Sequence, residues 1–115
     1  RVQGRTDEAA KRLIDAAATL DKVGTDVILL ECVPNHVTDA IMKVTTVPVI
    51  GIGAGPSTTG QVLVMHDLLG ITPDKSARFV KNFMETADSI QDAFKLYDQA
   101  VKDGSFPAQE HCFEN

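Results

Sequence analysis

The first part of the chain carries a helical pattern of apolar positions. Apolar residues recur at intervals of three and four, and they are Ala9, Leu13, Ala16, Leu20 and Val23. This spacing predicts a helix that buries one face. Thr6 is a good N-cap for it, Asp7 and Glu8 complement the helix dipole in the first turn, and Gly24 follows the last apolar position.

The pattern then changes to an unbroken apolar run. The residues Val27-Ile28-Leu29-Leu30 are followed by Glu31-Cys32-Val33-Pro34. A continuous run of this length is typical of a strand buried on both faces, as in parallel sheets. We therefore expect a buried strand that ends at Glu31.

The middle of the chain repeats this alternation. Asn35 is expected to cap a second helix, whose apolar positions are Val37, Ile41 and Val44. A second strand is predicted from Val47 to Ile50, with Pro48 near its start, and the glycine-rich segment 51–55 follows. A third strand candidate covers Val62 to Met65 and ends at His66-Asp67. The connection between residues 55 and 62 is short for parallel neighbours, so either it is unusually tight or residues 61–69 are helical.

The last part of the chain reads as helical from about Asp74 onward. Phe79, Val80 and Phe83 predict one apolar face, and a longer face follows at Ile90, Ala93, Phe94, Tyr97 and Val101. Gly104 is expected to end this helix. The stripe formed by Ile90, Phe94, Tyr97 and Val101 is expected to pack inside the fold, with packing between subunits as the alternative.

The order of these elements predicts an α/β fold with a parallel sheet and right-handed crossovers. The chain has 115 residues, begins at Arg1 without a Met, and offers only three strands. A (β/α)₈ barrel requires eight strands and about 250 residues. If these are barrel strands, we expect residues 1–115 to supply only part of one barrel domain.

Composition narrows the classes of partner. The formal net charge of −5 argues against a nucleic-acid partner, because such domains usually carry a basic face. No apolar run is long enough for a membrane span and no signal peptide is visible, so we expect a cytoplasmic protein. Cys32 and Cys112 are expected to be reduced thiols, although a single disulfide is the alternative.

Glu31 is the strongest candidate for chemistry. In parallel α/β folds the active site lies at the carboxyl ends of the strands, which is where Glu31 is expected. The edge of an apolar core makes a carboxylate a better base, so Glu31 is a candidate general base. A carboxylate paired with a nearby Lys or Arg is an equally acceptable interpretation at this point.

The other polar candidates favour structural roles. The segment Gly51-Ile52-Gly53-Ala54-Gly55 departs from the dinucleotide-binding pattern, because Pro56 and Thr58 stand where a third glycine is needed. Tight backbone packing is the favoured interpretation of this segment, and contact with a ligand is the alternative. No His or Cys grouping has the spacing of zinc ligands.

The roles of two histidines, Cys32 and Arg5 are interpreted from their positions in the chain. His66-Asp67 is interpreted as a structural pair at the edge of the sheet, and His36 as solvated. Cys32 is expected to be a small buried apolar residue. Arg5 is expected at the surface, with contact to an anionic ligand as the alternative.

Four sequence motifs, which follow one another in a fixed order along the chain, extend the interpretation of fold and function. They are Val2-Gln3-Gly4-Arg5, Leu30-Glu31-Cys32-Val33-Pro34, Ile50-Gly51-Ile52-Gly53-Ala54-Gly55 and Gly60-Gln61-Val62-Leu63-Val64-Met65-His66-Asp67. Their succession resembles the ketopantoate hydroxymethyltransferase family, and so does the ending from Gly104-Ser105-Phe106-Pro107 to Glu110-His111. The resemblance implies a (β/α)₈ barrel, related to the phosphoenolpyruvate/pyruvate barrels, of which this chain supplies strands 6, 7 and 8. It also implies a short connection between strands 7 and 8.

The resemblance implies a one-carbon transfer in pantothenate and coenzyme A biosynthesis. The family transfers a hydroxymethyl group from 5,10-methylenetetrahydrofolate to 3-methyl-2-oxobutanoate, giving ketopantoate. Mg²⁺ polarises the ketone of the keto acid in this family, and Glu31 matches the glutamate that removes the proton beside that ketone. No residue of this chain is identified as a substrate-binding residue.

The resemblance also implies what this chain lacks. The family's magnesium-binding acids and its substrate-binding Ser and Lys lie in the first five strands, so we expect no metal ligands here and no activity without the N-terminal half of the barrel. The family forms homo-oligomers, commonly decamers. Two alternatives stay open: a lyase of the phosphoenolpyruvate/pyruvate type, and a non-catalytic half-barrel that serves as an interaction domain.

Overall fold

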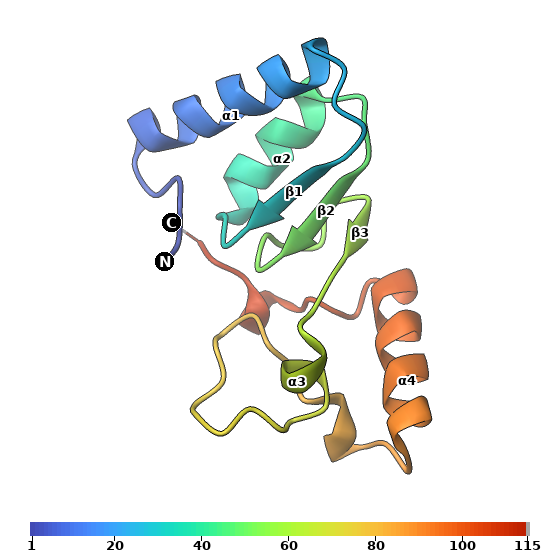
Figure 1. The fold of residues 1–115 in the computed structure, drawn as a ribbon. Coiled ribbons are helices and arrows are strands. Elements are labelled where there is room, and N and C mark those ends of the chain that lie inside the picture. The colour runs from blue at the N-terminus through green and yellow to red at the C-terminus, as the bar shows by residue number, and fades with distance from the viewer. Residues whose placement is uncertain (115) are drawn as a thin grey trace.

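The computed structural model describes residues 1–114 as an elongated body of 44 × 26 × 21 Å with two lobes. The first lobe contains a parallel sheet and two helices, and the second contains mostly helices and loops (Figure 1). The elements are α1 (Asp7–Lys22), β1 (Ile28–Glu31), α2 (Asn35–Val44), β2 (Val49–Ile52), β3 (Gly60–Gln61), α3 (Met65–Leu68), η1 (Phe83–Glu85), α4 (Ile90–Asp103) and η2 (Gln109–His111). This arrangement is a small mixed domain of helices and parallel strands, as the sequence pattern predicted.

Helix α1 begins as predicted but buries a different face. The hydroxyl of Thr6 accepts a hydrogen bond from the backbone N–H of Ala9 (3.2 Å), which confirms the N-cap. Ala10 and Ala17 are the buried positions, and Leu13 and Ile14 pack beside them. The predicted face was wrong at Ala16, which is exposed, and at Leu20 and Val23, which are 45% and 73% exposed. The Ala-rich pattern admits both faces, and contact with α2 selects the one that is buried.

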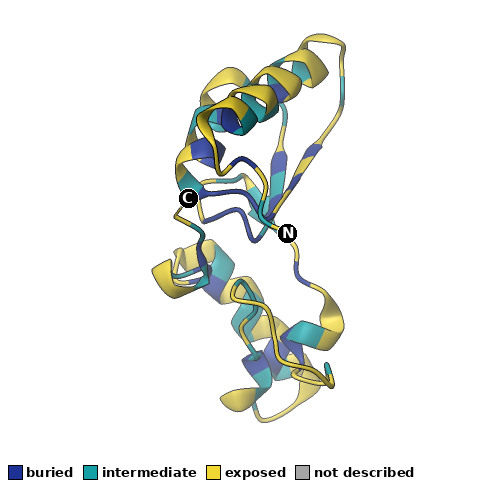
Figure 2. Ribbon diagram, turned by 90° about the vertical axis from the view of Figure 1, so that its left-hand side faces the viewer, coloured by how far each residue is buried: buried dark blue, intermediate teal, exposed yellow. Residues whose placement is uncertain are grey.

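The sheet has the order β1-β2-β3, and both pairs of strands are parallel. Helices α1 and α2 lie together on one side of it, and Figure 2 shows buried positions between the helices and the strands. Ile28 and Leu30 point into this core, whereas Val27 and Leu29 are 51% and 59% exposed. The expectation of a strand buried on both faces was therefore wrong, because only one face of the sheet is covered within residues 1–114.

The core of the first lobe is formed by aliphatic side chains between the sheet and the helices. Val49 and Ile41 are fully buried, and Val37 is 1% exposed. The helices and strands that hold this core also fix the carboxyl end of β1, where Glu31 lies. Burial of side chains of this size contributes roughly 1.5–3 kcal/mol each relative to exposure.

The third strand differs from the prediction. Only Gly60 and Gln61 pair with β2, and the predicted strand residue Met65 begins the short helix α3. The two alternatives for the connection after residue 55 are both confirmed in part, because the connection is tight and residues 65–68 are helical. Side chains support the tight connection: the hydroxyl of Thr59 accepts from the N–H of Val49 (3.0 Å), and the amide of Gln61 donates to the carbonyl of Gly55 (2.9 Å).

The second lobe has its own apolar cluster. Phe83, Tyr97 and Phe106 form edge-to-face aromatic pairs with ring centroids 5.4–5.9 Å apart. The predicted helical face at Phe79, Val80 and Phe83 was wrong: the chain forms a loop there, followed by η1. The three side chains still share this cluster, because Phe83 is buried in it and Phe79 and Val80 pack against it. Phe79 also lies against Gly53, directly after β2.

Helix α4 has the predicted extent, and Gly104 ends it with a left-handed φ of +81°. The prediction that its apolar stripe packs inside the fold was confirmed only in part. Tyr97 and Val101 pack in the second lobe, whereas Ile90 and Phe94 are exposed.

Candidate active site at the carboxyl edge of the sheet

Glu31 is the last residue of β1 and lies beside Ile52, the last residue of β2, in the parallel register. The alternation along β1 places Glu31 on the same face as Leu29, the face that no helix covers. Its side chain is exposed, and none of the ion pairs found in residues 1–114 involves it. The alternative of a carboxylate paired with Lys or Arg therefore has no support among the described residues.

Cys32 adjoins Glu31 but lies in a different environment. The residue has a left-handed φ of +52°, and its side chain is buried as predicted. Burial raises the pKa of the Cys32 thiol, and the neighbouring charge of Glu31 adds to the rise. Both Cys32 and Cys112 are free thiols, which agrees with the expectation of reduced cysteines.

Two distant segments meet at this edge of the sheet. The N–H of Gln3 donates to the carbonyl of Cys32 (2.8 Å), and the N–H of Asn35 donates to the carbonyl of Phe113 (3.0 Å). The prediction that Asn35 caps α2 was wrong, because Pro34 occupies the cap position and its side chain makes no capping bond. The carbonyl of Phe113 instead satisfies one of the free N–H groups at the start of the helix.

The glycine-rich segment after β2 packs tightly, as favoured from the sequence. Gly53 (φ +65°) lies against the ring of Phe79, where a Cβ would come within 2.9 Å of Cδ1. Gly55 (φ +79°) lies against the side-chain amide of Asn35, whose Oδ1 atom is buried without a hydrogen-bond partner. These contacts bring the loop before Phe83 and the start of α2 onto the end of β2.

The histidine candidates are not part of this edge cluster. His66 and Asp67 lie on α3 rather than at a strand end, so their predicted role as a pair at the sheet edge was wrong. His66 is exposed, and the carboxylate of Asp67 accepts a hydrogen bond from Thr72 (2.5 Å). His36 is exposed, as predicted.

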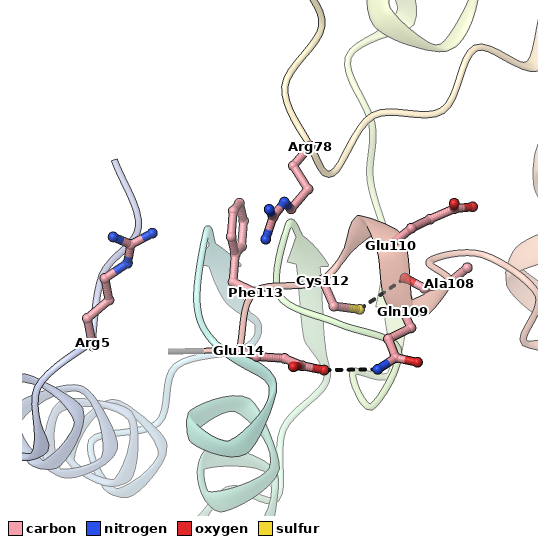
Figure 3. A pocket seen from close by; sticks show the side chains of 8 residues that line it. All are labelled: Arg5, Arg78, Ala108, Gln109, Glu110, Cys112, Phe113 and Glu114. Atoms are coloured by element: carbon pink, nitrogen blue, oxygen red, sulfur yellow. Dashed lines mark hydrogen bonds between the residues drawn. The ribbon is translucent and has the colours of Figure 1, made fainter.

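A hollow of about 860 Å³ opens at the same edge, between the N-terminal segment and the C-terminal tail. Figure 3 shows Arg5 and Arg78 on either side of the ring of Phe113. The guanidinium of Arg78 lies over that ring, 6.0 Å from its centroid. Sequence reasoning placed Arg5 at the surface, which is confirmed, and missed Arg78 and Phe113, because 35 residues separate them in the chain.

Two further properties bear on function. Residues 1–114 contain no group of three or more His, Cys, Asp or Glu side chains arranged to hold a metal ion. Among the helices described, none has the length and apolar character needed to cross a bilayer.

Comparison with known proteins is consistent with these features. The chain is 58% identical to a 3-methyl-2-oxobutanoate hydroxymethyltransferase of Alcanivorax borkumensis, 54% to one of Chromohalobacter salexigens and 52% to one of Hahella chejuensis. Each match covers 98% of this chain but 43% of the relative, so the chain spans less than half the length of these proteins.

A family-level match gives the same result. The family model described as ketopantoate hydroxymethyltransferase matches residues 1–109, which include Glu31, the glycine-rich segment and both arginines of the hollow. The chain therefore belongs to the ketopantoate hydroxymethyltransferase family.

Proposed function

We propose that this chain supplies the catalytic base of a ketopantoate hydroxymethyltransferase, with Glu31 as that base. The reaction transfers a one-carbon unit from 5,10-methylenetetrahydrofolate to 3-methyl-2-oxobutanoate, as part of pantothenate and coenzyme A biosynthesis. The names of the relatives support the transferase class over the lyase alternative. Retention of Glu31 at an open strand end favours catalysis over a purely structural role.

The proposed architecture is a (β/α)₈ barrel to which this chain contributes the last three strands. The bare face of the sheet supports this proposal, because Val27 and Leu29 there are apolar and exposed. An N-terminal half of the barrel would cover that face and turn it into the barrel interior. The proposal includes a homo-oligomer, as the family resemblance implies, and a cytoplasmic location, as expected from the sequence.

The proposed role of Glu31 follows from its position. The base takes the proton from the carbon beside the ketone, and the resulting carbanion forms a bond to the folate methylene carbon as one of its two C–N bonds breaks and that nitrogen takes up a proton. Water then adds to the methylene carbon as the second C–N bond breaks, which leaves the hydroxymethyl group on the keto acid and releases tetrahydrofolate, whose second nitrogen takes the proton from the water. Glu31 lies on the face that would become the barrel interior, at the end where barrel enzymes bind substrate. A positioned general base contributes about 10²–10⁴-fold in rate.

The proposed magnesium ion does not fit this chain. The described residues form no ligand group for it, so we place its ligands in the N-terminal half. When bound there, the ion would supply polarisation of the ketone. On this chain, the proposal rests on the placement of Glu31 alone.

The test measures removal of the proton from the keto acid separately from transfer of the one-carbon unit. This chain, joined to the N-terminal part of the Alcanivorax borkumensis relative, should exchange the proton beside the ketone of 3-methyl-2-oxobutanoate in D₂O without folate. Glu31→Gln should slow this exchange by about 10²–10⁴-fold, measured by NMR. Glu85→Gln, at an exposed glutamate of η1, is the matched control and should exchange at the unaltered rate.

Two results would contradict the proposal. Exchange by Glu31→Gln at the same rate as the unaltered protein would remove Glu31 from the base role. Formation of ketopantoate by this chain alone would show that the proposed N-terminal half is not required.

A further inference from the structure

The hollow at the carboxyl edge of the sheet contains two arginines without an anionic partner. None of the ion pairs in residues 1–114 involves Arg5 or Arg78. Two carboxylates also line the hollow, but Glu114 is bonded to the amide of Gln109 (3.2 Å). Glu110 is directed away from Arg78 in Figure 3, and it lies 3.9 Å from the ring nitrogen of His111. The hollow thus presents cationic side chains that are free to bind an anion.

The hollow also presents an aromatic surface. The ring of Phe113 lies between the two arginines, and it is held by an edge-to-face contact with Phe79 at 6.5 Å. Planar guanidinium groups stack on aromatic rings and also bind carboxylates through two parallel hydrogen bonds. A ligand that combines a flat ring with carboxylates matches this set of groups. The volume of about 860 Å³ lies within the range of small-molecule sites.

Backbone contacts connect this hollow to the end of the sheet that carries Glu31. Arg5 follows Gln3, which is bonded to Cys32, and Phe113 is bonded to Asn35 at the start of α2. Arg78 precedes Phe79, which packs on Gly53 after β2. All three groups of the hollow are therefore anchored within a few residues of the ends of β1 and β2.

We propose that this hollow binds the benzoyl-glutamate part of the folate co-substrate, with Arg5 and Arg78 pairing its carboxylates and Phe113 contacting its ring. This inference rests on the proposed function, which supplies the identity of the co-substrate. The keto acid is a poorer match, because it has one carboxylate and no ring. With the carboxylate end held here, the one-carbon end of folate is free to extend toward Glu31.

The test uses p-aminobenzoyl-L-glutamate, which contains the ring and both carboxylates but no reactive group. Calorimetric titration of the chain should show binding that weakens as NaCl is raised. Arg5→Gln and Arg78→Gln should each weaken binding about five- to tenfold, because each removes a charged hydrogen-bonding group. Lys75→Gln removes an exposed cation from the same loop as Arg78 without lining the hollow, and it should bind as the unaltered chain does.

A second variant tests the aromatic contribution. Phe113→Leu keeps an apolar side chain at this position but removes the ring, so it should weaken binding of the same probe. Thermal unfolding of each variant should match that of the unaltered chain, which separates lost binding from lost structure.

Other outcomes would overturn the inference. Inorganic phosphate that displaces the probe at equal concentration would show a general anion site, and 3-methyl-2-oxobutanoate that does so would assign the hollow to the keto acid. Absence of probe binding, or binding by both arginine variants as strong as that of the unaltered chain, would also reject it. None of these results alters the proposed function, because the proton exchange that tests Glu31 requires no folate.

Discussion

Glu31 and Cys32 are consecutive residues with opposite exposure: the carboxylate lies on the uncovered face of the sheet, whereas the thiol is buried and its backbone is left-handed. The turn at Cys32 ends β1 directly after the proposed base. The charge of Glu31 also contributes to the raised pKa of the Cys32 thiol.

The environment of this pair predicts that the Cys32 thiol reacts slowly. In a Cys112→Ala variant, which leaves Cys32 as the single thiol, reaction with a disulfide reagent at pH 8 should be at least about tenfold slower than that of free cysteine, because the thiolate is the reactive form. Adding Glu31→Gln should speed the reaction, since it removes one cause of the raised pKa. Labelling followed by absorbance checks both, and a rate equal to that of free cysteine would contradict the buried position.

A side chain at Gly55 is expected to lower the stability of the chain. A Cβ there would overlap Oδ1 of Asn35, and φ is +79°. Gly24→Ala is the matched control, because Gly24 also has a positive φ (+89°) but no atom within 4 Å of a Cβ. Gly55→Ala should lower the free energy of unfolding in urea by about 1–3 kcal/mol more than Gly24→Ala does. Equal losses would show that only backbone strain matters at Gly55.

Ile41 should be the more costly of two isoleucines to truncate. Its side chain is fully buried in the first lobe, whereas Ile71 is 59% exposed. Ile41→Ala should lower the free energy of unfolding by about 2–5 kcal/mol, and Ile71→Ala should change it by less than about 0.5 kcal/mol. Similar losses from both substitutions, measured by urea unfolding, would contradict the described core.

His111 should make stability depend on pH. Burial lowers the pKa of its imidazole, the charge of Lys81 acts in the same direction, and Glu110 opposes both. The neutral ring accepts a hydrogen bond from the N–H of Ala108 at Nδ1 (3.1 Å). A lowered pKa means that the folded state binds the proton less readily than the unfolded chain, so the contribution is present above pH 6.5 and is lost as pH falls through the lower folded pKa.

The measurement is the urea midpoint at pH 7.5 and at pH 5. The unaltered chain should lose stability between these values, and His111→Gln should lose less, because the residue that takes up the proton is gone. An equal loss in both proteins would exclude His111 as the cause.

A charge at Leu29 should leave the folding of this chain unchanged but block its association with an N-terminal part of the barrel. The exposed side chain of Leu29 belongs to the uncovered face, so Leu29→Asp should change the stability of the chain alone by less than about 0.5 kcal/mol. The same substitution should prevent association with the N-terminal part of a relative, because it would bury a charge in the proposed interior. Val23→Asp, at a 73% exposed position after α1, is the control and should associate normally in a pull-down. Association of Leu29→Asp would reject the proposed use of this face.

The sequence predicted the elements that have strong local signals. The capping residue Thr6 and the terminal glycine Gly104 are both observed, and so are the parallel strands with their helical crossover. Glu31 was placed correctly at the end of β1, because an unbroken apolar run followed by a carboxylate leaves little freedom in where the strand ends.

The failures occur where local patterns permit two outcomes. The run from Val62 to Met65 is too short to distinguish a strand from a helix start, and pairing with β2 ends at Gln61. Burial of β1 on both faces requires a covering layer that residues 1–114 do not contain. Arg78 and Phe113 carry no local signal, because only the folded tail brings them together.

The uncovered face of the sheet has a practical consequence for handling the chain. Contiguous exposed aliphatic side chains promote self-association, and strand edges without partners add to that tendency. Purification of the isolated chain should therefore yield material whose solubility falls steeply with concentration. Co-expression with a covering partner is the natural remedy, since occupation of that face would remove the cause of precipitation.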